Sequence, residues 1–152
     1  MKNFLIITLI LFLSSCAASK FVQKEDVNAF EFSRTSCYGK CPAYDVRIKN
    51  ESIFYYGKIY VEKKGAYKAT GGKELFKKLI AEAQQTKFFD MPNLLPPSGS
   101  VIPDLPSAKI RFVTKSKVKE VNYNHEGPPN LIKFLAYIDA QLDAVNWVKV
   151  QK

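Results

Sequence analysis

The sequence predicts an α+β fold, in which an antiparallel sheet of two hairpin regions packs against two helices as a single two-layer domain. Some segments alternate apolar and polar residues with the period of β-strands, whereas two others place apolar residues at helical spacing. Along the chain these segments follow the order strands, helix, hairpin, helix. Because strands and helices do not alternate, the pattern argues against a parallel β-α-β sheet.

Two hairpins are predicted with a definite register. The first turns at Asn50-Glu51 and the second at Lys115-Ser116, and in each the apolar residues then share one face, as a half-buried sheet requires. The expected cross-strand pairs are Val46 with Tyr55, Ile48 with Ile53, Ala108 with Tyr123, Ile110 with Val121, Arg111 with Glu120, and Phe112 with Lys119.

Further strands are expected over residues 30–34, 58–61, 66–69 and 145–150. Residues 92–106 contain five prolines, a density that neither a helix nor a central strand tolerates, so a loop is expected there.

Two amphipathic helices complete the predicted fold. The first should run from about Lys73 to Lys87, after which Phe88-Phe89 folds back into the core. The second should begin after Gly127-Pro128-Pro129, because proline favours the first helical position. Its expected buried stripe consists of Leu131, Phe134, Leu135, Ile138 and Leu142.

The N-terminus has the features of a lipoprotein signal peptide. Residues 4–13 are apolar, a run much shorter than the about 20 residues that a membrane-spanning helix needs. Leu13-Ser14-Ser15-Cys16 resembles the lipobox of bacterial lipoproteins, which implies cleavage after Ser15 and a lipid on Cys16. We therefore expect a signal peptide over residues 1–15, a lipidated tether over 16–29 and a domain over 30–152. An ordinary secretory signal is the alternative.

The formal net charge is +9, but the lysines are spread along the chain, which argues against a nucleic-acid partner. An excess of this size would suit anionic head groups or an acidic partner, but a solvated basic surface is the favoured explanation.

If Cys16 carries the lipid, Cys37 and Cys41 are the two cysteines that remain. An exported protein is in an oxidising compartment, so we expect these two to form a disulfide. The alternative is a copper site or a redox-active thiol pair that uses Cys37, Cys41 and His125, since two thiolates and an imidazole suit Cu(I). The following residues have a strand pattern, so the helix dipole that would activate such a thiol is missing.

Residues 34–44 carry a family resemblance. Arg34-Thr35-Ser36-Cys37-Tyr38-Gly39-Lys40-Cys41-Pro42-Ala43-Tyr44 resembles the signature of an uncharacterised bacterial family, domain of unknown function 6438. Phe88-Phe89, Asp104-Leu105-Pro106 and Gly127-Pro128 fit the same family. The resemblance covers roughly residues 30–145 and implies an exported or lipid-anchored domain of this topology, but no activity.

No nucleophile elbow, phosphate-binding loop or zinc-protease helix occurs in the sequence, so neither an enzyme nor a cofactor is expected. A possible binding surface is formed by Tyr38, Phe54, Tyr56 and Asp104. Strand alternation leaves Phe54 and Tyr56 on the face opposite Tyr44 and Tyr55, where they would contact a protein, a glycan or a second packed layer. The sequence thus predicts a non-enzymatic binding module in the cell envelope, anchored by lipid to the outer membrane and facing the periplasm, with an envelope protein or glycan as its partner.

Overall fold

A computed structural model describes residues 27–115 and 117–151 as one eight-stranded sheet with two α-helices. The predicted signal peptide and Cys16 lie outside the described residues. The strands are β1 (Val27–Arg34), β2 (Ala43–Lys49), β3 (Ser52–Ile59), β4 (Gly65–Ala69), β5 (Leu94–Leu95), β6 (Ala108–Thr114), β7 (Val118–Tyr123) and β8 (Val148–Lys149). The helices are α1 (Gly72–Gln85), the short 3₁₀ helix η2 (Phe88–Asp90) and α2 (Pro129–Asp143). The fold is therefore α+β, as predicted.

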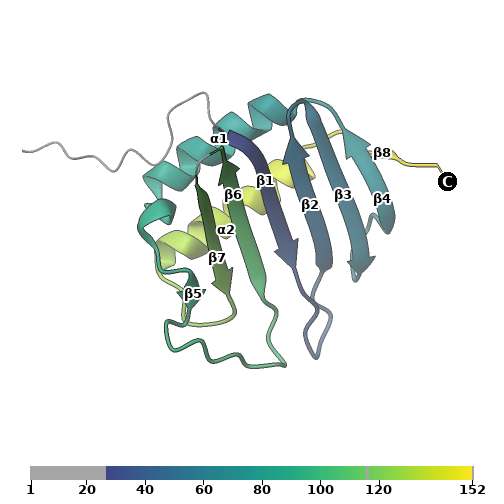
Figure 1. Ribbon diagram of the computed structural model, residues 1–152. Helices are drawn as coiled ribbons and strands as arrows, with labels where there is room; N and C mark the ends of the chain where they lie inside the picture. Colours follow the sequence, from purple (N-terminus) through teal and green to yellow (C-terminus); the bar gives the residue numbers. More distant parts are fainter. Residues whose placement is uncertain (1–26, 116, 152) are drawn as a thin grey trace, which may run out of the picture.

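The strands lie in the order β5-β7-β6-β1-β2-β3-β4-β8. Figure 1 shows both α-helices crossing behind the sheet, so that the face toward the viewer carries no helix. Both hairpins have the predicted register, with Ile48 opposite Ile53 and Ile110 opposite Val121. No helix within the described ranges is long and apolar enough to span a membrane.

One edge of the sheet differs from the prediction. The expectation of a wholly antiparallel sheet is wrong because β5, inside the proline-rich loop, pairs in parallel with β7. Backbone N–H groups of Asn122 and Asn124 donate to the carbonyls of Asn93 and Leu95, at 2.8 and 3.0 Å. Since β5 is an edge strand with one free side, Pro96 can follow it directly without breaking a ladder.

Two strand boundaries also differ. The separate strand expected over residues 58–61 does not form, since β3 continues to Ile59 and Tyr60 leaves the ladder with a φ of 53°. Gly57 allows the following turn to fold over the strand, because a Cβ there would lie 1.8 Å from the carbonyl oxygen of Lys63. At the N-terminus, β1 begins at Val27, so the strand starts before the expected domain boundary at residue 30.

The core lies between the helices and the inward face of the sheet. The φ of 55° at Lys87 ends the α-helical conformation. The next residue is Phe88, and the ring of Phe88 is fully buried. It lies 5.6 Å from the ring of Phe112 and 5.2 Å from that of Phe134, which joins η2, β6 and α2. All five residues of the predicted α2 stripe are buried.

Lys119 occupies an inward position opposite Phe112, as its place in the hairpin requires. Its ammonium group donates to the carbonyl oxygen of Met91 and, at 3.1 Å, to Oδ1 of Asn93. These bonds satisfy a buried cation, and desolvation lowers the pKa of Lys119. The lysine thereby fixes the start of the proline-rich loop to the sheet.

Candidate functional site

The loop between β1 and β2 is closed by the predicted disulfide. Cys37 and Cys41 are bonded, with their Cα atoms 5.5 Å apart, and Sγ of Cys37 accepts a hydrogen bond from the backbone of Gly39. Tyr38 stands at the tip of this loop with 91% of its surface exposed. The disulfide therefore presents one aromatic side chain on a short, cross-linked turn.

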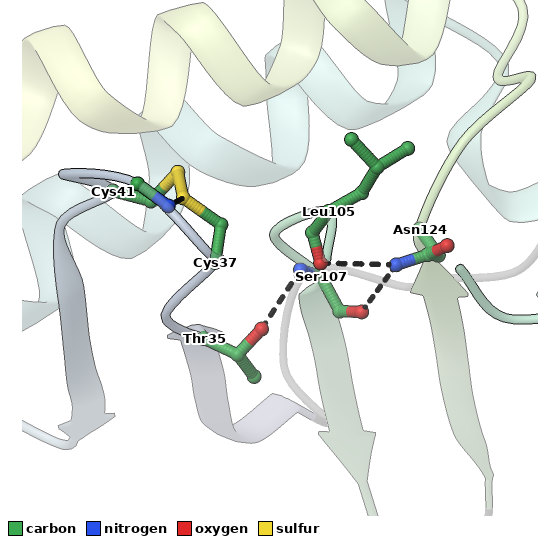
Figure 2. Close-up of a disulfide and its surroundings, with 7 residues drawn as sticks. Thr35, Cys37, Cys41, Leu105, Ser107 and Asn124 are labelled. Atoms are coloured by element: carbon green, nitrogen blue, oxygen red, sulfur yellow. Dashed lines mark hydrogen bonds between the residues drawn. A yellow bond between two sulfur atoms is a disulfide. The ribbon is translucent and has the colours of Figure 1, made fainter. Parts of the chain in front are cut away.

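This disulfide loop is attached to the end of the proline-rich loop. The backbone N–H of Thr35 donates to the carbonyl oxygen of Ser107 at 2.9 Å, and the N–H of Ser107 donates to Oγ1 of Thr35 at 2.8 Å. The N–H of Tyr38 donates to the carbonyl of Asp104 at 3.2 Å. Figure 2 shows Thr35 and Ser107 facing each other beside the disulfide. The two loops thus form one connected rim at the same end of the sheet (Figure 1).

A buried amide holds the proline-rich loop in place. Oδ1 of Asn124 accepts the N–H of Ile102 at 2.8 Å. Figure 2 shows its Nδ2 donating to Oγ of Ser107, at 2.9 Å, and to the carbonyl of Leu105, at 3.3 Å. Asn124 itself is 7% exposed, so these bonds are shielded from water. Val101, Ile102 and Leu105 are exposed on the loop that it orders.

Phe54 and Tyr56 lie on the uncovered face of the sheet, 48% and 54% exposed, as strand alternation predicts. They border a half-open hollow of about 390 Å³ that also contains Glu31, Arg47 and Arg111. Within the described ranges, no second layer covers these rings. They are mid-strand residues of β3, whereas Tyr38 and Asp104 belong to the rim at the strand ends. The structure therefore divides the predicted binding residues into two pairs.

A row of alternating charges crosses the uncovered face. Arg111 contacts Glu31 at 2.8 Å and Glu120 at 3.4 Å, and Glu31 also contacts Arg47 at 3.4 Å. Glu120 is on β7, Arg111 on β6, Glu31 on β1 and Arg47 on β2, and each lies directly opposite the next in the strand pairing. Each carboxylate of the row is therefore neutralised by a neighbouring arginine.

Basic charge remains after this pairing. Asp45 on the same face pairs with Lys58 at 2.7 Å. Lys49, Lys68 and Lys109 also belong to this face by register, and they have no ion-pair partner in the part of the chain that the structure describes. The uncovered face consequently carries an excess of positive charge around its two aromatic rings.

A second hollow, of about 280 Å³, adjoins the first and shares Ser33 and Lys109 with it. The proline-rich loop borders this hollow through Leu94, Pro96 and Val101. The two hollows therefore lie next to each other between the aromatic pair and the ordered loop.

The three residues of the predicted copper or thiol alternative do not form a cluster of metal ligands. Because the sulfurs of Cys37 and Cys41 are bonded to each other, neither is a thiolate in this state. His125 is hydrogen-bonded through Nδ1 to Asn124 at 2.8 Å and lies 4.0 Å from Glu126. No group of three metal-binding side chains occurs among residues 27–115 and 117–151.

A third site was not predicted from the sequence. Arg34 donates from Nε and Nη2 to the two carboxylate oxygens of Asp139, at 3.2 and 2.5 Å, and the hydroxyl of Tyr44 donates to Oδ1 at 2.5 Å. Burial and the neighbouring Asp139 raise the pKa of Tyr44. Arg34 lies on the same inward face of β1 as Phe30 and Phe32. A charged residue at such an inward position of a strand is the sequence signal that could have indicated a buried partner of opposite charge.

This cluster lies in a cleft of about 400 Å³ between the ends of β1 to β3 and the C-terminal half of α2. Tyr55, Tyr60 and Trp147 also line the cleft. The ring of Tyr55 lies 5.3 Å from that of Tyr44 and 5.3 Å from that of Trp147, so the aromatic residues form a continuous wall.

These features define an α+β domain with an uncovered sheet face, a cross-linked rim and an aromatic cleft. The chain belongs to the family described as Domain of unknown function (DUF6438), which matches residues 28–142. The match spans β1 to α2 and so includes the disulfide loop and the Arg34, Tyr44 and Asp139 cluster. No curated protein matches the chain significantly.

Proposed function

We propose that this protein is a lipid-anchored, non-enzymatic binding module of the cell envelope, held at the outer membrane and facing the periplasm. The N-terminal lipobox supports the anchor and its destination. The uncovered face of the sheet supports the binding role, and the exposed pair Phe54 and Tyr56 within a basic surface is the observation that carries it.

The chemistry of this face favours a protein partner with an acidic surface. Aromatic residues and arginine are the types most enriched at interface hot spots, and here Arg47 and Arg111 stand beside the two rings. The lysines that lack ion-pair partners accelerate association with an acidic surface at low salt. The hydration of two half-exposed aromatic rings is unfavourable, and a partner that covers them removes this unfavourable free energy.

Site-specific photo-crosslinking in membranes of the source bacterium tests the binding role. A crosslinking residue at position 54 should capture a discrete partner, whereas the same residue at Ile132, which is 45% exposed on α2, should not. Replacing Arg47 by Glu should weaken capture at position 54, and capture should decrease with added salt. Equal capture at both positions, or insensitivity to charge and salt, would contradict the proposal.

The anchor is tested separately with the full-length chain. Cys16→Ser should abolish incorporation of an alkyne-labelled fatty acid and release the protein from the membrane fraction. A Cys37→Ser, Cys41→Ser double variant is the matched control, and it should keep both the label and the membrane association. Label retained in the Cys16→Ser variant would refute lipidation at this residue.

A further inference from the structure

The cleft beneath α2 has a residual charge opposite to that of the protein. Arg34 is bound by Asp139, and Lys63 pairs with Glu62 at 3.6 Å. Asp143 faces the same cleft and has no ion-pair partner in the described part of the chain. One unpaired carboxylate thus remains in a cleft of a chain whose formal net charge is +9.

Asp143 follows Asp139 by four residues on α2, so both carboxylates lie on one side of the helix. Like charges at this spacing repel each other along the helix. Arg34 neutralises only one of the two. Burial, followed by the nearby charge of Asp143, raises the pKa of the neighbouring Tyr55 to about 12.

The aromatic wall stands beside this carboxylate. The indole Nε1 of Trp147 donates to the carbonyl oxygen of Leu142 at 3.0 Å, which fixes the orientation of the ring. Tyr55 packs against it, and Tyr60, 50% exposed, borders the opening. The faces of tryptophan and tyrosine attract cations within about 6 Å of the ring centroid.

We propose that this cleft binds a small organic cation through its ammonium group, which lies against the aromatic wall formed by Tyr55 and Trp147 and beside the carboxylate of Asp143. The volume of about 400 Å³ suits a small molecule or a single side chain. Aromatic rings beside one carboxylate discriminate for a charged, weakly hydrated ammonium group over a neutral group of the same shape. This site is separate from the uncovered face and does not depend on the function proposed for it.

Trp147 is the only tryptophan of the chain, so its fluorescence reports directly on the cleft. The purified protein is titrated with choline and, in parallel, with 3,3-dimethylbutan-1-ol, which has the same shape without the charge. Choline should change the Trp147 emission in a saturable manner, and the neutral analogue should bind at least about tenfold more weakly, a difference of about 1.4 kcal/mol.

Two variants complete the test. Asp143→Asn should weaken choline binding by about fivefold or more, whereas Glu74→Gln, which removes an exposed carboxylate from α1, should leave it unchanged. Equal binding of choline and its neutral analogue would overturn the proposal, as would unaltered binding by Asp143→Asn. Methyl glycosides are titrated in parallel, and a response to these but not to choline, or to no probe at all, would equally overturn it.

Discussion

Removing the carboxylate of Asp139 should destabilise the domain by about 2 kcal/mol. Asp139→Ala leaves the guanidinium of Arg34 and the hydroxyl of Tyr44 without their shared acceptor. The side chains of Arg34 and Asp139 are 20% and 36% exposed. The pair therefore lies between exposed pairs, which contribute about 0–1 kcal/mol, and buried ones, whose disruption costs about 3–5 kcal/mol. The better helix propensity of alanine offsets at most about 0.7 kcal/mol.

Urea denaturation measures this effect, provided that the slope of the unfolding free energy with urea concentration stays constant. The midpoint of thermal unfolding should fall by about 6–8 °C for a domain of this size. Glu51→Gln is the matched control, because Glu51 and Lys73 form an exposed pair, with side chains 56% and 64% accessible. It should cost less than about 1 kcal/mol. A decrease of less than about 0.5 kcal/mol in the unfolding free energy of Asp139→Ala would refute the reasoning. It would also be refuted if the effects of Asp139→Ala and Arg34→Met on the unfolding free energy were additive in the double variant.

Three further predictions concern the rim and the tyrosines. Replacing both Cys37 and Cys41 by serine should lower the free energy of unfolding by only about 2 kcal/mol in urea, because the closed loop is short; failure of the variant to fold would contradict this. Asn124→Ala should increase the amide hydrogen exchange of Ile102, which loses its acceptor, while β2 keeps its protection; unchanged exchange at Ile102 would show that the loop is held otherwise. Stability should fall as the pH rises from about 10 to about 12, because tyrosines release protons in the unfolded chain at their ordinary pKa of 10.0 but Tyr55 retains its proton to about 12 in the folded state. The pKa of Tyr44 is raised as well, so Tyr44 contributes to the same loss of stability and Tyr44→Phe should make the decline shallower. A pH dependence identical to that of the native protein would show that the pKa of Tyr44 is not raised by folding.

Local patterns predicted much of this fold because they report on local physics. Alternation with a period of two specifies which face of a strand is buried, and a one-residue slip would expose Ile48 and Ile53. The register of both hairpins therefore followed from the sequence, as did the buried stripe of α2 and the insertion of Phe88. The disulfide expected between Cys37 and Cys41 is also present.

Contacts between distant segments were not predictable in the same way. Nothing local indicates that β5 pairs in parallel with β7, since two residues carry no period. Arg34 and Asp139 are separated by 105 residues, and only the placement of α2 over the strand ends brings them together. The aromatic cleft also depends on that placement, and it was not predicted from the sequence. For the same reason, Phe54 and Tyr56 were predicted as outward residues and Arg111 was paired with Glu120, but the continuation of that pair through Glu31 to Arg47 was not predicted.

The central position of β1 determines the order in which this domain can fold. β1 is hydrogen-bonded to β2 on one side and to β6 on the other, and Glu31 contacts Arg111 across 80 residues of sequence. β2, β3 and β4 are joined by short turns, so this meander can form early, whereas the β1–β6 pairing must close a long loop first. A nascent chain that ends before residue 108 has an unpaired edge on β1, and such an edge invites association with other chains. The sheet is complete only after both its N-terminal and its C-terminal strands are available, which makes the eight-stranded sheet with its helices, rather than its N-terminal half, the unit of folding.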